Sequence, residues 1–141
     1  MLSHYTVTSL IHAKELKAVS LIAAIPNENE HTLYFFYRKE KVVLPITVTY
    51  SNSTYLDFIV ESFRSLEINV TQIIIAEEAN LLKATLKIVS STATRHITLN
   101  LNDGICLAAK CNAEVLVSAD FLDKYGIKVT KELLERSISD I

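Results

Sequence analysis

The sequence predicts an α+β domain built on a mixed, mostly antiparallel β-sheet with a few packed helices. Two observations predict this class. Segments rich in β-branched and apolar residues come in runs separated by short turns, as in antiparallel hairpins. Half of the 141 residues are hydrophobic and only two are glycine and two proline, so the chain has the composition of an ordered domain without a linker. We expect one domain over residues 1–141, and leave open whether a C-terminal helix within 129–141 is an appendage.

The predicted strands rest on alternating or continuous apolar patterns. Leu82–Ile88 alternates apolar and polar residues, as in an antiparallel strand with one face in water, and Ile73–Ile75 is fully apolar. Pro45 donates no hydrogen bond, so its strand should have an edge, a bulge or a bend there. The predicted strands are Tyr5–Ile11, Ala18–Ile25, His31–Tyr37, Val42–Thr49, Asn69–Ala76, Leu82–Ile88, Thr94–Leu101 and Ala113–Ser118.

Helices are predicted where apolar residues recur every three or four positions. In Thr54–Leu66, the residues Tyr55, Leu56, Ile59, Val60 and Phe63 form one stripe. Thr54 and Asp57 have the spacing of a capping box. Gly104–Cys111 is apolar nearly all round and should be buried. Ala119–Tyr125 should end at Gly126, and Thr130 should begin the last helix.

Charge and cysteine content limit the classes of protein. A net charge of −2 argues against a protein that coats nucleic acid through many phosphate contacts. No apolar run approaches the roughly 20 residues that span a bilayer, and the N-terminus lacks the pattern of a signal peptide. Cys106 and Cys111 lie about 140° apart around their predicted helix, so they should be free thiols. We therefore expect a cytoplasmic protein with no membrane contact.

The order of residues from Ile97 to Gly126 is the most specific pattern in the chain. A strand leads into Asn102-Asp103-Gly104-Ile105-Cys106-Leu107-Ala108, followed by a short strand and a helix closed by glycine. Leu44-Pro45-Ile46 lies at a matching position upstream. In this order, the chain from Val42 to Gly126 resembles the bifunctional nuclease family. The resemblance implies a bifunctional nuclease-like α+β fold, a homodimer, and metal-assisted cleavage of DNA or RNA with Mg²⁺ or Mn²⁺.

Asp103 is the candidate catalytic residue that the resemblance implies, and Asn100 and Asn102 are the candidate substrate-binding residues. The residues alone allow a second reading, in which Asp103 is the N-cap of a buried helix. Asn100 and Asn102 would then line the solvated face of their strand. The residues that would hold the metal are undetermined, because no histidine has the spacing of a metal ligand with another His, Cys, Asp or Glu.

Two functions follow from this sequence. One is a working nuclease, which carboxylates from Glu61, Glu77 or Glu78 close to Asp103 would favour. The other is a degenerate family member that serves as a binding or protein-interaction module, which helix-capping bonds at Asp103 beside an apolar groove would favour. The mean hydropathy of +0.27 indicates that another subunit covers some apolar surface, as in a homodimer.

Overall fold

Eight strands form one mixed sheet in the computed structural model, which describes residues 15–49 and 54–139. The strand order is β6-β5-β4-β7-β1-β2-β3-β8, and every neighbouring pair is antiparallel except β4 and β7. The strands are β1 (Leu16–Asn27), β2 (Glu30–Tyr37), β3 (Val42–Thr49), β4 (Asn69–Glu78), β5 (Leu81–Val89), β6 (Thr94–Asn100), β7 (Glu114–Ser118) and β8 (Ile127–Lys128). The expected α+β class with a mostly antiparallel mixed sheet is confirmed.

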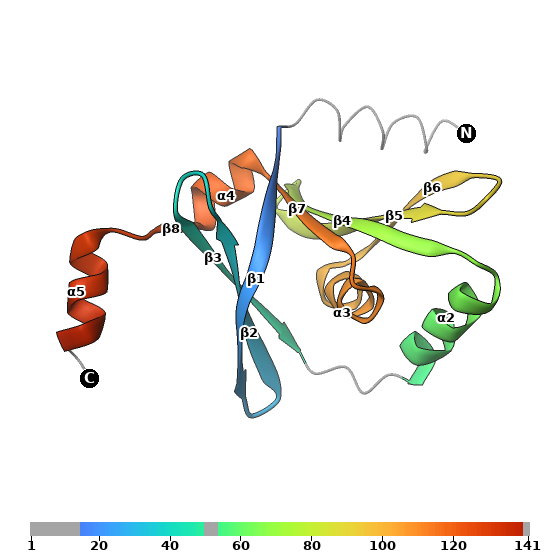
Figure 1. Cartoon of the computed structure of the whole chain (residues 1–141), viewed down its shortest axis with the longest axis horizontal. Helices are drawn as coiled ribbons and strands as arrows, with labels where there is room; N and C mark the ends of the chain where they lie inside the picture. Colours follow the sequence, from blue (N-terminus) through green and yellow to red (C-terminus); the bar gives the residue numbers. More distant parts are fainter. Residues whose placement is uncertain (1–14, 50–53, 140–141) are drawn as a thin grey trace.

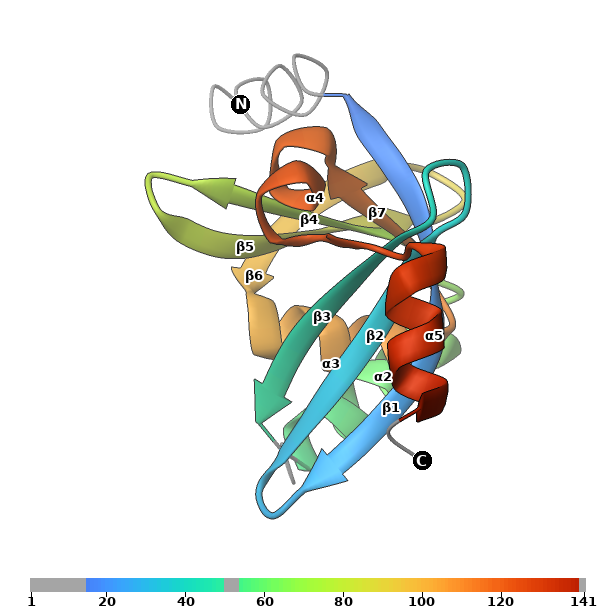
Figure 2. The ribbon, with the colours of Figure 1, turned by 90° about the vertical axis from the view of Figure 1, so that its left-hand side faces the viewer.

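The sheet consists of two halves that share β1. Residues Leu16–Val19 pair with β7, and Ser20–Asn27 pair with β2. The register slips between Leu21 and Ala23, just after the point where the partner strand changes. Such a bulge bends and twists a strand. As a result, the β1–β2–β3 half crosses the β4–β5–β7 half steeply in both views (Figures 1 and 2).

The described part of the chain contains four helices, which are α2 (Thr54–Ser65), α3 (Leu101–Cys111), α4 (Ala119–Tyr125) and α5 (Lys131–Ser139). Helix α3 is central, since it contacts β4, β5 and β6 of one half-sheet, β3 of the other, and α2. Helix α5 stands to one side of the sheet in Figure 1. None of the helices in the described ranges is long and apolar enough to cross a membrane.

The core lies between α3 and the concave side of the two half-sheets. Ile105, Leu107 and Ala108 of α3 are buried, and with them Leu44, Ile73, Ile75, Leu86 and Val117 from four strands form one apolar cluster. Helix α3 approaches β5 closely at Gly104, where an added Cβ would lie 2.4 Å from the Cβ of Ala84. This glycine therefore allows the helix to pack directly on β5.

Most predicted elements are confirmed, with boundaries shifted by a few residues. Pro45 does lie at an edge, because β8 pairs only with Val42 and Val43 of β3. The prediction of one apolar stripe on α2 is partly wrong, since Tyr55 is 51% exposed whereas Leu56 is buried. The capping box predicted at Thr54 and Asp57 stays a prediction, because the side chain of Thr54 lies outside the described residues; the carboxylate of Asp57 accepts a hydrogen bond from Lys110. The strand predicted at Tyr5–Ile11 likewise lies outside the described residues.

Candidate functional site

The candidate site lies where β6 runs into α3 without a loop. Asn100, the last residue of β6, has extended backbone angles (φ −63°, ψ 157°) and is the N-cap of α3. Its side-chain oxygen accepts a hydrogen bond of 2.8 Å from the backbone N–H of Asp103. The Nδ2 of Asn100 in turn donates to Oδ2 of Asp103 over 2.9 Å. This reciprocal pair resembles a capping box, which satisfies amides that a helix leaves unpaired.

The N-cap prediction for Asp103 is therefore wrong in position, although capping does occur at this site. We expected the helix to begin at Gly104, but it begins at Leu101, which places Asp103 in the first turn. The reason is that Asn100 supplies the capping oxygen, so the helix extends three residues toward β6. Asn100 stays on its strand as the exposed last residue of β6, paired with Lys83, whereas Asn102 lies in the first turn of α3 and not on the strand where we expected it.

A tyrosine from a distant segment completes the cluster. Tyr55 lies in the first turn of α2, and its hydroxyl donates to Oδ2 of Asp103 over 3.1 Å. This hydrogen bond to Asp103 raises the pKa of Tyr55 above its ordinary value. Sequence reasoning missed Tyr55 because it lies 48 positions from Asp103 and was assigned to an apolar stripe. No local signal distinguishes it from the other apolar residues of that stripe.

The side chain of Asn102 contacts β3 and not Asp103. Its side-chain oxygen accepts a hydrogen bond of 2.6 Å from the backbone N–H of Thr49, at the end of β3. The structure thus brings Asn100 and Asp103 together but gives Asn102 a connecting role between α3 and the other half-sheet. An amide oxygen engaged in this way holds the chain in place and is not available as a free substrate contact.

Two of the carboxylates that would have favoured a nuclease bind cations elsewhere. Glu61 pairs with Arg64 within α2, at 2.7 Å. Glu77 accepts hydrogen bonds from Lys124 (2.8 Å) and from the hydroxyl of Tyr125 (2.9 Å), and these two donors lower its pKa. Its side chain is only 19% exposed, so it ties β4 to α4 and is not a solvated turn residue. Asp57 pairs with Lys110 at 2.7 Å and links α2 to α3.

The residues around Asp103 do not fit a resident Mg²⁺ or Mn²⁺ ion. Mg²⁺ prefers near-octahedral coordination by oxygen and is usually held by one or two carboxylates with substrate phosphate. Here a single carboxylate, with hydrogen bonds from an amide and a phenol on its Oδ2 atom, is the only acidic member of the cluster. Within residues 15–49 and 54–139, no group of three or more His, Cys, Asp or Glu side chains is arranged to hold a metal.

An apolar groove of about 530 Å³ lies between α3 and the first two strands, where the two half-sheets diverge. Apolar side chains make up most of its walls, and its residues at the C-terminal end of α3 include Asn112 and Ala113. The wall residues from β1, β2 and α3 include Val19, Leu21, Leu33, Phe35, Ile105 and Ala108. Asp103, Asn100 and Tyr55 are not among its lining residues, so this is an apolar groove on α3 but not the groove beside Asp103 that would have favoured an interaction module.

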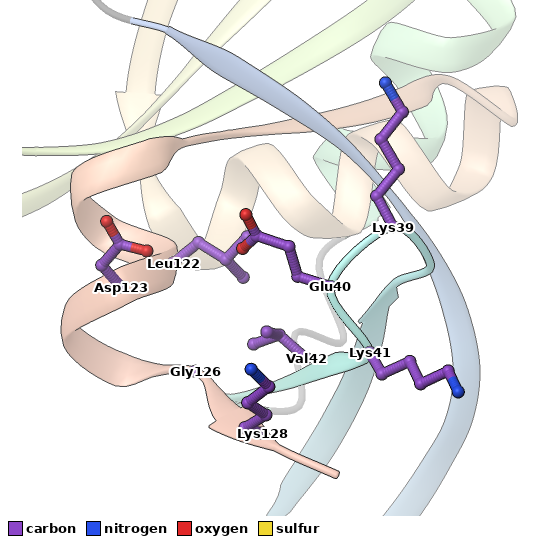
Figure 3. Close-up of a pocket in the computed structure, with 8 residues that line it drawn as sticks. All are labelled: Lys39, Glu40, Lys41, Val42, Leu122, Asp123, Gly126 and Lys128. Carbon is purple, nitrogen blue, oxygen red and sulfur yellow. The ribbon is translucent and has the colours of Figure 1, made fainter.

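A second pocket, of about 570 Å³, lies between the β2–β3 turn and the end of α4. Lys39 and Lys41 line it, but their side chains point away from it, while Glu40 extends toward Leu122 (Figure 3). Basic side chains that diverge in this way do not form the continuous cationic track that a nucleic-acid strand requires. The pocket therefore offers mixed charge with no clear ligand class.

Comparison with known proteins adds no assignment to these features. No protein-family model matches the chain, and no curated protein is significantly similar to it.

Replacing Asn100 by Ala should lower the free energy of unfolding by about 1 kcal/mol, because α3 loses its capping oxygen. Urea unfolding followed by circular dichroism measures this change. Asn100→Ser is the matched control, since serine is also a good N-cap, and it should recover most of the loss. Equal destabilisation by the two substitutions would mean that the cap is not what Asn100 contributes.

Proposed function

We propose that this chain is a non-catalytic interaction module on a bifunctional nuclease-like fold, and that its binding surface is the apolar groove beside α3. The observation that carries the proposal is the state of Asp103. Its Oδ2 atom accepts hydrogen bonds from Asn100 and Tyr55, both part of the scaffold that joins β6, α2 and α3. The most nuclease-like residue of the sequence thus has a structural role that accounts for its presence.

The chemistry of phosphodiester cleavage supports this choice. Cleavage requires an activated water and groups that stabilise negative charge on the phosphoryl oxygens. The basic residues of the two neighbouring helices are Arg64 of α2 and Lys110 of α3, and they pair with Glu61 and Asp57. Within the described residues, the cations of these two helices are thus already paired, and Asp103 is the one carboxylate of the cluster with Asn100 and Tyr55.

A metal-assisted nuclease acting on DNA or RNA is the second candidate, and a specific observation favours it. Asp103 is only partly buried at the N-terminal end of an 11-residue helix, beside a phenol and an amide. In this reading, Asp103 would be the catalytic residue and Asn100 would contact the substrate, and Mg²⁺ or Mn²⁺ would have to arrive with the substrate phosphate, because the described residues do not form a resident metal site. The free thiols of Cys106 and Cys111, whose pKa values are raised mainly by burial, suit the expected cytoplasmic location under either proposal.

A cleavage assay separates the two candidates. We expect no cleavage of labelled single- or double-stranded DNA or RNA above the background of the Asp103→Asn variant, in Mg²⁺, in Mn²⁺ or in EDTA. Asp103→Asn has nearly the same shape and keeps an oxygen that can accept from Tyr55, so it should stay folded. Metal-dependent cleavage by the native chain that the variant loses would establish the nuclease and overturn the interaction module.

A further inference from the structure

One stretch of β1 is an open, apolar strand edge. Beyond Val19, where the pairing with β7 ends, Ser20–Asn27 is paired with β2 on one side, and no other described strand pairs with it. All eight of these residues are exposed. They include three large apolar side chains, namely Leu21, Ile22 and Ile25, which are 51%, 57% and 53% exposed. This hairpin projects past α3 at one end of the molecule in both views (Figures 1 and 2).

The other strand edges of the described sheet are protected in ways that this one is not. At one end of the sheet, β8 is only two residues long, and its neighbour β3 contains Pro45. At the other end, β6 carries Arg95 and His96 and then turns directly into α3. Short length, proline and charge are the usual devices that prevent unwanted strand pairing. Ser20–Asn27 has no charged residue, and its one proline, Pro26, lies next to its end.

We propose that the Ser20–Asn27 edge of β1 pairs in antiparallel fashion with the same edge of a second copy of this chain. The inference rests on the proposed function, in which the apolar groove is a binding surface, and it names a second copy of this chain as the partner of that surface. Two-fold pairing places a strand opposite itself, so a charged residue near the axis would face its own copy and repel it. An uncharged segment of eight residues avoids this repulsion, and the expected homodimer then has a defined interface.

The groove provides the additional area that such a dimer needs. A stable interface buries roughly 800 Å² on each partner, and strand pairing through main-chain hydrogen bonds is one part of that area. Val19, Ser20 and Leu21 of β1 belong both to this strand and to the wall of the groove. The edge and the groove are therefore continuous, and the hairpin of a second copy that pairs with the edge also covers apolar side chains beside it.

The test compares two lysine substitutions in the full chain. Sedimentation and light scattering over a wide range of protein concentration should show a dimer for the native chain. Ile25→Lys places a charge in the proposed interface and should weaken dimerisation at least about tenfold. Phe58→Lys is the matched control, because Phe58 is 73% exposed on α2 and lies outside the edge, and it should leave dimerisation unchanged.

Hydrogen exchange identifies what covers the edge. The amides of Ser20–Asn27 that point away from β2 should become protected as the protein concentration rises, and Ile25→Lys should remove that protection. Protection that is independent of concentration would mean that another part of the same chain, such as residues 1–14, covers the edge, and would overturn the proposal. A monomer at all concentrations, or a dimer broken by Phe58→Lys and not by Ile25→Lys, would overturn it as well.

The cleavage assay on the same preparations keeps this inference separate from the proposed function. Cleavage by a dimer that Ile25→Lys dissociates would overturn the non-catalytic function and retain the interface. A monomer that does not cleave nucleic acid would overturn the interface and retain the non-catalytic function.

Discussion

Gly104→Ala is expected to lower the free energy of unfolding by about 2 kcal/mol, although alanine is the better helix former. An added Cβ would lie 2.4 Å from the Cβ of Ala84, a fixed atom on β5, which is paired on both sides. Carbon atoms pack best at about 3.5–4.0 Å, so the helix or the strand must move. Overpacking of this kind costs about 1–3 kcal/mol or more, and the gain of about 1 kcal/mol in helix propensity offsets only part of it.

Thermal and urea unfolding at one protein concentration measure this loss, which corresponds to a fall in Tm of roughly 6 °C. Ala84→Gly in the same chain removes the opposing methyl group, so the double variant should be more stable than the two separate losses predict. Ala109→Gly, on an exposed position of the same helix, reports propensity alone and should destabilise by about 1 kcal/mol. A stabilised Gly104→Ala protein would show that α3 does not pack this closely on β5.

Gly126→Ala is expected to lower the free energy of unfolding by about 2 kcal/mol, through a different contact. The new Cβ would lie 2.4 Å from two atoms, the backbone oxygen of Leu122 and Cγ1 of Val42. That oxygen also accepts a hydrogen bond of 2.8 Å from the N–H of Gly126, which closes α4. The end of α4 must therefore shift away from β3, and the short pairing of Ile127 with Val43 weakens.

Urea unfolding measures this change, and Val42→Ala is the informative companion. It removes one of the two colliding atoms but leaves the carbonyl of Leu122, so the double variant should recover only part of the lost stability. The φ of Gly126 is −73°, which alanine adopts without strain. If the close contacts were absent, Gly126→Ala would stabilise the protein by about 0.4–1 kcal/mol, through the reduced entropy of the unfolded chain.

These two glycines also show where sequence reasoning fell short. We expected Gly126 in the usual position after a helix, where glycine commonly adopts a left-handed conformation, but its backbone is extended. Left-handed conformations in the described residues occur instead at non-glycine positions, including Ala79 and Asn80 of the β4–β5 turn. Both glycines are required by close packing, and that packing depends on residues distant in sequence, Ala84 for Gly104 and Val42 for Gly126.

The residues of the candidate site also divide into those that local sequence patterns predicted and those that depend on distant segments. Asp103 was singled out correctly as a helix-start residue, because the change from strand alternation to an apolar helix is a local pattern. The cap itself is Asn100, since a hydrogen bond to the backbone depends on the register of the first turn, which local patterns define only within a few residues. Tyr55 was missed as a partner of Asp103, and Thr49 as a partner of Asn102, because α2 and β3 meet α3 only after the chain has folded.

Hydrophobic periodicity was sufficient to predict the α+β class, the antiparallel hairpins and most elements of the described chain, because strand and helix repeats depend on neighbouring residues. Only the tertiary structure decided that β1 joins two half-sheets, that β7 lies parallel to β4, and that part of β1 has a partner on one side only among the described strands. It also decided that Asp103 binds an asparagine and a tyrosine without a second carboxylate. These features depend on which segments meet, and pairing between distant segments is set by the packing of the whole core.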